Sequence, residues 1–521
     1  MTIIATQAPA STASRPTTLG ALRASGYQSR SVRAELRANL RAALRDGRPL
    51  FPGVLGYERT VIPNLVNAVL AGHDILLLGL RGQAKTRLLR GLTSFLDPEI
   101  PILAGSDIND DPFAPVSVPG QTLIAEAGDD APIEWLPRAA RYNEKLATPD
   151  VSIADLLGDV DPIKAATRRL TYADPEVIHF GIVPRTNRGI FAINELPDLA
   201  PRIQVGLLNI LEERDLQIRG FPIRMPLDIL LVFSANPEDY TNRGSIITPL
   251  KDRIASQILT HYPPDVGIAA EITQQEAWTM RNGDDNAGDA RVPVAVSERF
   301  RLLIEEVAFA ARDSELVDQS SGVSARMSIA ALELLVSNLE RRGLRTGDAP
   351  VTPRVCDLHL LLPAITGKVE MVYEGEQQGA EVVAKKLLGQ AVKRVFEQLF
   401  PAVDRALGSG GEDDNGPYAD IVRWFVAGNT VSLDDEMPFA DYRAALEQVP
   451  GLWDLVAPHG DDDGERAMLA ELLLDGLNQH LKLAREDLDS QVSYKEMVRF
   501  QLLRPNRRRR GRDDDDDSGI N

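Results

Sequence analysis

The sequence predicts an α/β protein in which a parallel sheet is flanked by helices, followed by an all-α domain and a mostly helical C-terminal region. Short apolar runs typical of buried strands lie at Ile75–Leu78, Gly189–Asn194 and Ile229–Ser234. Segments with helical spacing separate these runs, and strands that alternate with helices favour a parallel sheet. After Pro263 the apolar residues recur at helical spacing, which predicts helices from there on.

Helices are predicted on both sides of the first strand. Ser31–Arg45 and Val61–Ala71 have apolar residues at helical spacing, and Ile75–Leu78 is the first buried strand. A glycine-rich loop follows this strand, and Thr86–Phe95 is the next helix. The order of strand, loop and helix is typical of the start of a parallel α/β sheet.

The chain between the first two strands is long and irregular. Pro98–Val183 contains Asp/Pro-rich stretches and one helix candidate near Ser152–Leu157. Beyond the second strand, Gln204–Arg214 is amphipathic, and the alternation in Leu216–Met225 predicts a hairpin with Phe221-Pro222 at its tip.

Composition and periodicity divide the chain into six parts. They are a disordered N-terminus (1–30), the α/β domain (31–265) with an insertion near 98–151, a helical lid domain (266–405), a Gly/Asp-rich linker (406–417), a separate helical C-terminal region (418–503) and a disordered charged tail (504–521). In the lid, helices are predicted at 269–281, 297–312, 328–341 and 355–373.

The composition excludes several classes of function. The single cysteine, Cys356, cannot form an internal disulfide or a cysteine zinc site. The net charge of -19 argues against a surface that tracks nucleic-acid phosphates, so we expect no nucleic-acid partner. No apolar run is long enough to span a bilayer and the start does not resemble a signal peptide, so we expect a cytoplasmic protein without membrane insertion.

The glycine-rich loop has the composition of a phosphate-binding loop. Its glycines let successive backbone N–H groups point at phosphate oxygens, the lysine reaches the β- and γ-phosphates, and the threonine hydroxyl is a ligand for Mg²⁺. The residues are Gly79, Leu80, Arg81, Gly82, Gln83, Ala84, Lys85 and Thr86. Ala84 stands where the usual pattern has glycine, and we expect one added methyl group to be tolerated at a helical start. The loop therefore predicts binding of ATP with Mg²⁺.

The second strand ends in a pair of polar residues, Asn194 and Glu195. In a phosphate-loop ATPase the first of these positions orients hydrated Mg²⁺ and the second polarises the attacking water. Asn194 can accept a hydrogen bond from Mg²⁺-bound water but carries no charge, whereas Glu195 is the expected general base. The uncharged Asn194 leaves the rate of hydrolysis open.

Two further residues complete the candidate site. Asn236, in Ser234-Ala235-Asn236-Pro237-Glu238, follows the third strand and is placed to orient water beside the γ-phosphate. Arg253, in Leu250-Lys251-Asp252-Arg253, is a candidate arginine finger that stabilises charge on the transferring phosphate across a subunit boundary.

These four motifs, in this order, resemble those of the AAA+ ATPases, and more narrowly the branch that contains MoxR and the magnesium-chelatase ATPase subunit. The resemblance covers about 51–373. The further segments that carry it are Phe51-Pro52-Gly53-Val54-Leu55-Gly56, Leu156-Leu157-Gly158-Asp159-Val160-Asp161 (similar to the helix-2 insert that projects toward the ring pore), Asn187-Arg188-Gly189-Ile190, the hairpin Leu216–Met225 and Thr248-Pro249-Leu250-Lys251-Asp252-Arg253.

The resemblance implies a homo-oligomeric ring, usually a hexamer, with ATP between neighbouring subunits. It places Lys85, Thr86, Asn194, Glu195 and Asn236 in cis and Arg253 in trans. It also implies a sensor arginine in the lid, for which Arg326 is the first candidate and Arg354 the second. Members of this branch commonly work with a von Willebrand factor A domain protein, and this sequence contains no Asp-x-Ser-x-Ser run typical of that domain.

The leading hypothesis is an AAA+ ATPase with a chaperone-like role, which couples ATP hydrolysis to the remodelling of a protein partner. Two alternatives stay open: the ATPase subunit of a magnesium chelatase, and a nucleotide-gated scaffold with slow turnover, which Asn194 suggests. Transcriptional activation or nucleic-acid unwinding is disfavoured by the acidic charge and by the lack of a basic recognition helix.

Overall fold

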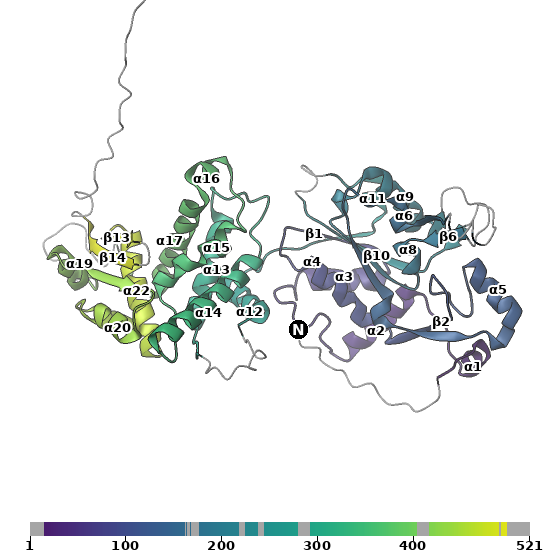
Figure 1. Ribbon diagram of the computed structural model, residues 1–521, viewed down its shortest axis with the longest axis horizontal. Coiled ribbons are helices and arrows are strands. Elements are labelled where there is room, and N and C mark those ends of the chain that lie inside the picture. Colours follow the sequence, from purple (N-terminus) through teal and green to yellow (C-terminus); the bar gives the residue numbers. More distant parts are fainter. Residues whose placement is uncertain are drawn as a thin grey trace, which may run out of the picture. The chain divides into compact units, whose positions relative to one another are not determined.

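The computed structural model describes residues 15–161, 163, 167, 177–217, 224–237, 244–279, 292–403, 416–488 and 491–497. The chain forms two compact units, Met1–Pro264 and Asp265–Asn521 (Figure 1). The first unit contains a sheet with a hydrophobic cluster on each face, and the second has one large cluster of its own. The predicted fold class is confirmed: an α/β P-loop fold followed by a helical region.

The core of the first unit is a five-stranded parallel sheet. The strands lie in the order β11 (Ser256–Leu259), β1 (Ile75–Leu78), β10 (Ile229–Ala235), β7 (Gly189–Asn194) and β4 (Tyr142–Leu146). Side chains alternate between the faces of a strand, so Leu76 and Leu78 of β1 join one cluster while Ile75 and Leu77 join the other. Because both faces are buried, the central strands have no polar alternation.

Helices cover both faces of this sheet (Figure 1). One face carries α2 (Val32–Arg45), α3 (Val61–Ala71), α4 (Lys85–Gly91) and the 3-10 turn η1 (Leu92–Phe95), and the other carries α6 (Ile153–Leu156), α8 (Ile182–Arg185), the 3-10 turn η5 (Leu196–Asp198), α9 (Pro201–Glu212) and α11 (Thr248–Arg253). The predicted helix at 86–95 is therefore α4 followed by a 3-10 turn. The predicted hairpin is present as the antiparallel strands β8 (Asp215–Gln217) and β9 (Arg224–Pro226). The predicted tip Phe221-Pro222 lies outside the described residues. A further antiparallel pair, β5 (Gly158–Val160) with β6 (Ile178–Phe180), was not predicted.

The predicted insertion is smaller than expected. It consists of the antiparallel strands β2 (Glu99–Leu103) and β3 (Ile133–Pro137), with α5 (Val118–Ala127) and the 3-10 turn η2 (Gly128–Asp130) between them. The 3-10 turn η3 (Arg138–Arg141) leads from β3 into β4, which is one of the two edge strands of the core sheet. The sequence did not reveal β4, because its side chains are half-buried and mostly polar, unlike those of the central strands.

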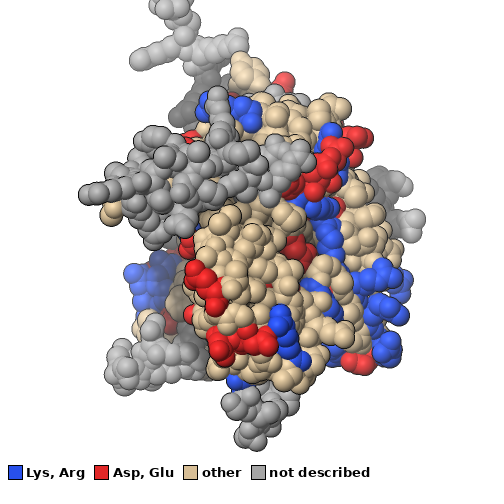
Figure 2. Space-filling model, turned by 90° about the vertical axis from the view of Figure 1, so that its right-hand side faces the viewer, with Lys and Arg blue, Asp and Glu red and all other residues tan. Residues whose placement is uncertain are grey.

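On the face shown in Figure 2, acidic and basic side chains are interspersed.

The N-terminus is also more ordered than predicted. A short helix, α1 (Leu19–Ala24), lies against the insertion, where Leu19 N donates to Ala131 O (2.9 Å) and Ile133 N donates to Thr17 O (3.0 Å). Buried Leu19 and Leu22 secure it, so the expectation of disorder up to residue 30 is wrong for these residues. Residues 1–14 lie outside the described part.

The second unit is mostly helical but is not divided as predicted. Its elements are α12 (Val266–Glu276), α13 (Glu298–Asp313), α14 (Arg326–Thr346), η6 (Val355–Leu361), α15 (Leu362–Thr366), α16 (Tyr373–Gln378), α17 (Ala380–Leu399), α19 (Ala419–Val426), β12 (Val431–Asp434), α20 (Phe439–Glu447), α21 (Leu452–Val456), α22 (Asp463–Gln479), β13 (Leu483–Leu488) and β14 (Gln491–Glu496). The last part includes a three-stranded antiparallel sheet, in the order β12, β14, β13. The predicted single helix at 355–373 is instead a 3-10 turn and short helices, interrupted near Pro363 and Gly367.

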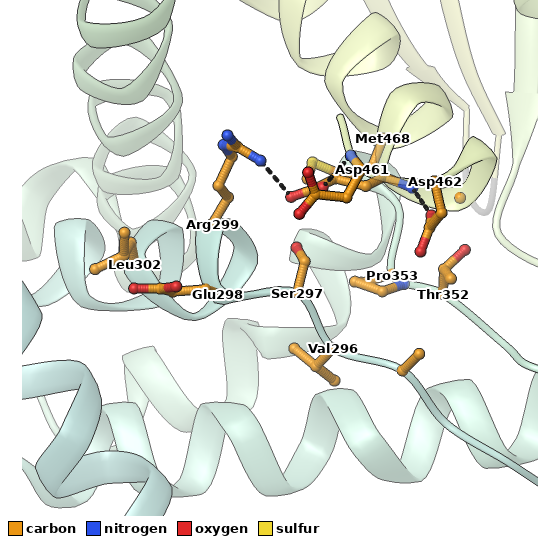
Figure 3. A pocket seen from close by; sticks show the side chains of 13 residues that line it. Val296, Ser297, Glu298, Arg299, Leu302, Thr352, Pro353, Asp461, Asp462 and Met468 are labelled. Carbon is orange, nitrogen blue, oxygen red and sulfur yellow. Dashed lines mark hydrogen bonds and ion pairs between the residues drawn. The ribbon is translucent and has the colours of Figure 1, made fainter. Parts of the chain in front are cut away.

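The C-terminal region shares its hydrophobic core with the lid, so the prediction of a separate region after residue 418 is wrong. One cluster runs from Phe300 on α13 to Tyr494 on β14. Figure 3 shows the start of α22 beside the start of α13, around a cavity of about 530 Å³ where Arg299 forms an ion pair with Glu465 (2.7 Å). The sequence did not reveal this union, because the Gly/Asp-rich stretch between the regions reads as a linker by composition. Residues 404–415, which include most of the predicted linker at 406–417, lie outside the described residues, as does the tail from 498.

A fully buried carboxyl group joins the two regions. Glu471 on α22 accepts hydrogen bonds from Val355 N (2.8 Å) and from the Tyr442 hydroxyl (2.6 Å). Its other oxygen has no hydrogen-bond partner among the described residues. Burial disfavours the charged form and raises the pKa of Glu471 to about 7.

A buried ion pair fixes the edge of the core sheet at β4. Arg141, which precedes β4, forms a two-pronged ion pair with Glu35 on α2 (2.7 and 2.6 Å), and both side chains are at most 3% exposed. Arg141 also donates to Arg188 O (2.9 Å), before β7. One guanidinium thus ties α2 to the entry of two neighbouring strands.

Loss of one partner of this pair leaves a buried charge without compensation. Arg141→Met is expected to lower the free energy of unfolding by about 3–5 kcal/mol, measured by urea denaturation. The additional substitution Glu35→Leu should recover part of that loss. Lys385→Met, which removes a solvent-exposed ion pair with Glu381, is the matched control and should cost less than about 1 kcal/mol. Equal losses in the two single variants would contradict the assignment.

The raised pKa of Glu471 makes the second unit sensitive to pH. The stability that its protonated form contributes is fully present below the pKa of the unfolded chain and is lost as the pH rises through about 7. Glu471→Gln should therefore weaken the decline in stability between pH 5 and pH 8, by about 3 kcal/mol at most. Urea denaturation at both pH values measures this, with Glu298→Gln as the exposed control. An unchanged decline in the Glu471 variant would refute the assigned pKa.

Candidate functional site

The phosphate-loop segment joins β1 to α4 and is packed too closely for a side chain at its first position. A Cβ atom on Gly79 would overlap the hydroxyl of Thr260 and the side-chain oxygen of Gln83. Gly79 N donates to Ala235 O at the end of β10 (3.1 Å), which continues the sheet pairing into the loop. Glycine is required here because the backbone approaches its neighbours closely.

Side chains that the sequence did not single out hold this loop in place. The Thr260 hydroxyl donates to Gln83 Oε1 (2.7 Å), and the Tyr57 hydroxyl lies 2.9 Å from Gln83 O and 2.7 Å from His261 O. The Tyr262 hydroxyl donates to Arg81 O (2.9 Å). Burial raises the pKa of Tyr57 to about 12, so its hydroxyl stays protonated as a donor. No motif marks these residues, because they meet the loop only through the folded sheet.

Ala84 occupies a left-handed backbone conformation, with φ 52° and ψ 18°. The expectation that alanine is tolerated here because the position is a helical start is therefore wrong: Ala84 precedes the helix, in a region that favours glycine. The next residue, Lys85, is 8% exposed, and its ammonium group donates to Gly79 O and to Leu80 O (3.0 Å). The Thr86 side chain is half-buried in the first turn of α4.

The polar pair after β7 lies beside the end of β10. The Ser234 hydroxyl donates to Asn194 Oδ1 (3.1 Å) and accepts from Glu195 N (3.4 Å). Glu195 has φ 55° and ψ 51°, a left-handed conformation that is uncommon outside glycine. Such strain persists only where neighbouring contacts impose it, and it is frequent at functional sites. Ser234 lies inside a predicted motif, but its role became visible only with the strand register.

The parallel register brings these groups to one edge of the sheet. Leu78, the last residue of β1, pairs with Ala235, and Ile193 of β7 pairs with Phe233. The phosphate-loop segment, the Asn194–Glu195 pair and Asn236 therefore follow three adjacent strands at their carboxyl ends. Asn236 is 4% exposed. The carboxyl edge of an open α/β sheet is where ligands bind in this class of fold.

Arg253 ends α11 and is held within its own chain. Its guanidinium Nε donates to Glu212 Oε2 (2.6 Å), and Nη1 donates to Pro249 O (3.0 Å). Glu212 is the last residue of α9. The contacts of the finger candidate in this structure are therefore made within its own chain.

The two sensor candidates differ in their surroundings. Arg326 is exposed at the first residue of α14, in the second unit. Arg354 is 2% exposed, donates to Asp434 O (2.9 Å) and Met437 O (2.7 Å), and lies over the Tyr442 ring at 4.3 Å. These contacts make Arg354 a structural residue of the second unit, which argues against it as the sensor.

The described residues contain no group of three or more His, Cys, Asp or Glu placed to hold a metal ion. Among the helices that the structure describes, none has the length and apolar character needed to cross a membrane.

No protein-family model matches the chain, and no curated protein sequence matches it. Among solved structures it is similar to the complex between subunits BchI and BchD of magnesium chelatase, with 20% identity and a TM-score of 0.32 over 64% of this chain and 99% of that chain. It is also similar to NtrX from Brucella abortus in complex with ADP, with 15% identity and a TM-score of 0.38 over 70% of this chain and 67% of that one.

The strain at Ala84 can be removed. Ala84→Gly is expected to raise the free energy of unfolding of the first unit by about 0.5–1 kcal/mol, because relief of the left-handed alanine outweighs the added entropy of the unfolded chain. Urea denaturation measures the change. Ala42→Gly, within helix α2, is the control and should lower stability by about 1 kcal/mol. A loss of stability in Ala84→Gly would contradict the strained conformation.

Proposed function

We propose that this chain is an AAA+ ATPase that binds and hydrolyses ATP with Mg²⁺ at the subunit interfaces of a homo-oligomeric ring, and that uses the cycle to remodel a protein partner. The observation that carries the proposal is the convergence of three segments at the carboxyl edge of the sheet: Gly79–Thr86, the pair Asn194–Glu195, and Asn236. Their types and order resemble those of phosphate-loop ATPases, with Asn194 in place of the usual Asp.

Each residue of the edge has a distinct task. Bound ATP and Mg²⁺ supply the phosphoryl group and the main positive charge. The ammonium of Lys85 exchanges its carbonyl partners in the loop for phosphate oxygens, and Thr86 and Asn194 present oxygens toward the metal and its water. Glu195 accepts the proton of the attacking water, and Asn236 orients that water.

Ser234 supports this arrangement through its contacts with Asn194 Oδ1 and Glu195 N. The Ser234 hydroxyl orients the amide of Asn194. The lone pair of Asn194 Oδ1 that is not used in this bond is then directed at the proposed position of the metal-bound water. The hydroxyl also stabilises the left-handed backbone of Glu195, which sets the direction of the carboxylate. A base that is positioned before the substrate arrives loses less entropy in the transition state.

The unit of function in this proposal is the ring. Arg253 is offered to the site of a neighbouring subunit, where it stabilises charge on the transferring phosphate, and Arg326 reports on the nucleotide from the lid. A hexamer and a von Willebrand factor A domain partner follow from the resemblance of the motifs to the MoxR branch. The magnesium-chelatase subunit is the second candidate, on the same resemblance. A cytoplasmic location is part of the proposal and is an expectation from the sequence.

Hydrolysis and binding can be separated by two substitutions. Lys85→Ala should abolish detectable ATP binding, because the phosphates lose their main protein cation. Glu195→Gln should retain binding but lower kcat by about 10²–10⁴-fold, because the base is removed. Isothermal titration with ATP and phosphate-release assays at several protein concentrations measure both effects. Arg87→Ala, an exposed position on the same helix, is the control.

Three outcomes would change the proposal. Hydrolysis by Glu195→Gln at the parent rate would sink the assigned mechanism. Binding without concentration-dependent hydrolysis in the parent would favour the slow scaffold that Asn194 suggests.

To identify the partner, the ATP-locked Glu195→Gln chain serves as bait, with Lys85→Ala as the matched control. Nucleotide-dependent capture of a von Willebrand factor A protein supports the remodelling role, whereas capture of a porphyrin-binding subunit supports the chelatase.

A further inference from the structure

The segment that carries the finger candidate is attached to the segment that carries the general base. Helix α9 starts six residues after Glu195, at Pro201, and ends at Glu212. The described finger segment, 244–253, packs along this helix and the turn before it. Three contacts at different positions hold the two segments together.

The first contact is a backbone approach without a side chain. A Cβ atom on Gly244 would overlap the carbonyl oxygen of Pro197, in the turn directly after Glu195. Only glycine lets the start of the finger segment lie against this turn. The start of the finger segment is therefore in close backbone contact with this turn.

The second contact is a fully buried amide. The side chain of Gln204, 0% exposed, donates to Leu199 O (2.8 Å) and to Ser245 O (3.0 Å) and accepts from Ile247 N (2.9 Å). Its donors and acceptor thus join the turn after the base to the backbone that precedes α11. A buried amide with all of these partners holds one orientation, because each lost bond would leave a polar group unsatisfied.

The third contact is the ion pair at the far end of α9. Glu212 holds the guanidinium of Arg253 through Nε (2.6 Å), and α9 itself is secured to the core by its buried face. Residues Ile203, Leu207, Ile210 and Leu211 make up that face. A helix of this length spans about 18 Å and moves as one body, because its backbone hydrogen bonds and packing resist bending.

We propose that α9 mechanically couples the two residues that its chain contributes to two different nucleotide sites, the base Glu195 and the finger Arg253. Gln204 and Glu212 are the positioning residues of this coupling. Through them, the state of the base in one subunit sets the position of the finger that the same subunit offers to its neighbour. The inference rests on the proposed function, because it takes Glu195 as the base and Arg253 as the finger in trans. Glu212 also restricts the rotamers of Arg253. The guanidinium therefore loses less conformational entropy when it contacts the phosphate of ATP in the neighbouring subunit.

Mixed rings test the coupling in trans. A donor chain with Glu195→Gln cannot hydrolyse ATP but keeps its finger, and an acceptor chain with Arg253→Ala keeps its base but offers no finger. Each alone should be nearly inactive, and the mixture should regain phosphate release at interfaces where donor Arg253 completes the acceptor's site. Failure of this complementation would refute the trans finger itself, which belongs to the proposed function.

The coupling is tested by changing only the donor. Glu212→Ala added to the donor should lower the complemented rate by about tenfold, although that chain has no catalysis of its own to lose. Glu212→Gln, which keeps an acceptor for Nε, should recover part of the rate. Glu213→Ala, the adjacent exposed carboxylate on the same helix end, is the matched control and should leave the rate unchanged. Thermal melting and ATP affinity of each donor verify that it is folded.

Gln204→Leu in the donor provides the second arm. It keeps the volume but removes the bonds to the finger segment, and should lower the complemented rate in any donor that still melts as a folded chain. If complementation by the Glu195→Gln donor is intact and Glu212→Ala does not reduce it, the coupling is refuted while the ATPase proposal stands. Equal losses in Glu212→Ala and Glu213→Ala would also overturn it, because a general charge effect would then explain both.

Discussion

The parallel pairing of β1 with β10, and of β10 with β7, is the constraint on which the candidate site depends. Residues far apart in the chain follow these three strands, and the register brings them to one edge. The strands are apolar on both faces, so a slip of one residue would exchange side chains between two differently packed clusters. The hydrophobic core therefore sets the relative positions of the polar groups that the proposed chemistry uses.

Local strain accumulates at this edge and the fold compensates for it. Ala84 and Glu195 both have left-handed backbones. Ala84 directly precedes Lys85, which is proposed to bind phosphate, and Glu195 is itself the proposed base. The hydroxyl groups of Tyr57, Thr260 and Tyr262 donate hydrogen bonds to the loop around Ala84, and the Ser234 hydroxyl accepts one from Glu195 N. Strain of about 1–3 kcal/mol for each such residue is sustainable only in a rigid surrounding. The packed sheet supplies this rigidity, and α9 extends it to the finger segment.

The second unit uses buried polar contacts to join parts that are distant in sequence. Arg354 is bonded to the backbone around residues 434–437, and Glu471 bonds Val355 and Tyr442 across the same junction. Each of these groups is costly to bury, and each has partners only when the lid and the C-terminal region are packed together. The C-terminal region and the lid thus form one compact unit with a single hydrophobic core.

The amino-acid sequence by itself determined the fold class, the three central strands, most of the flanking helices and the segments that carry phosphate-site chemistry, because these follow from local periodicity and from short motifs. Other features became visible only in the folded chain. They are the edge strands β4 and β11, the supports Tyr57, Thr260 and Ser234, the left-handed backbone of Ala84, and the union of the C-terminal region with the lid. The physical reason is the same for all of them: each depends on contacts between residues far apart in the chain. The local pattern of apolar residues predicts which face of a segment is buried. It does not predict which other segment packs against that face.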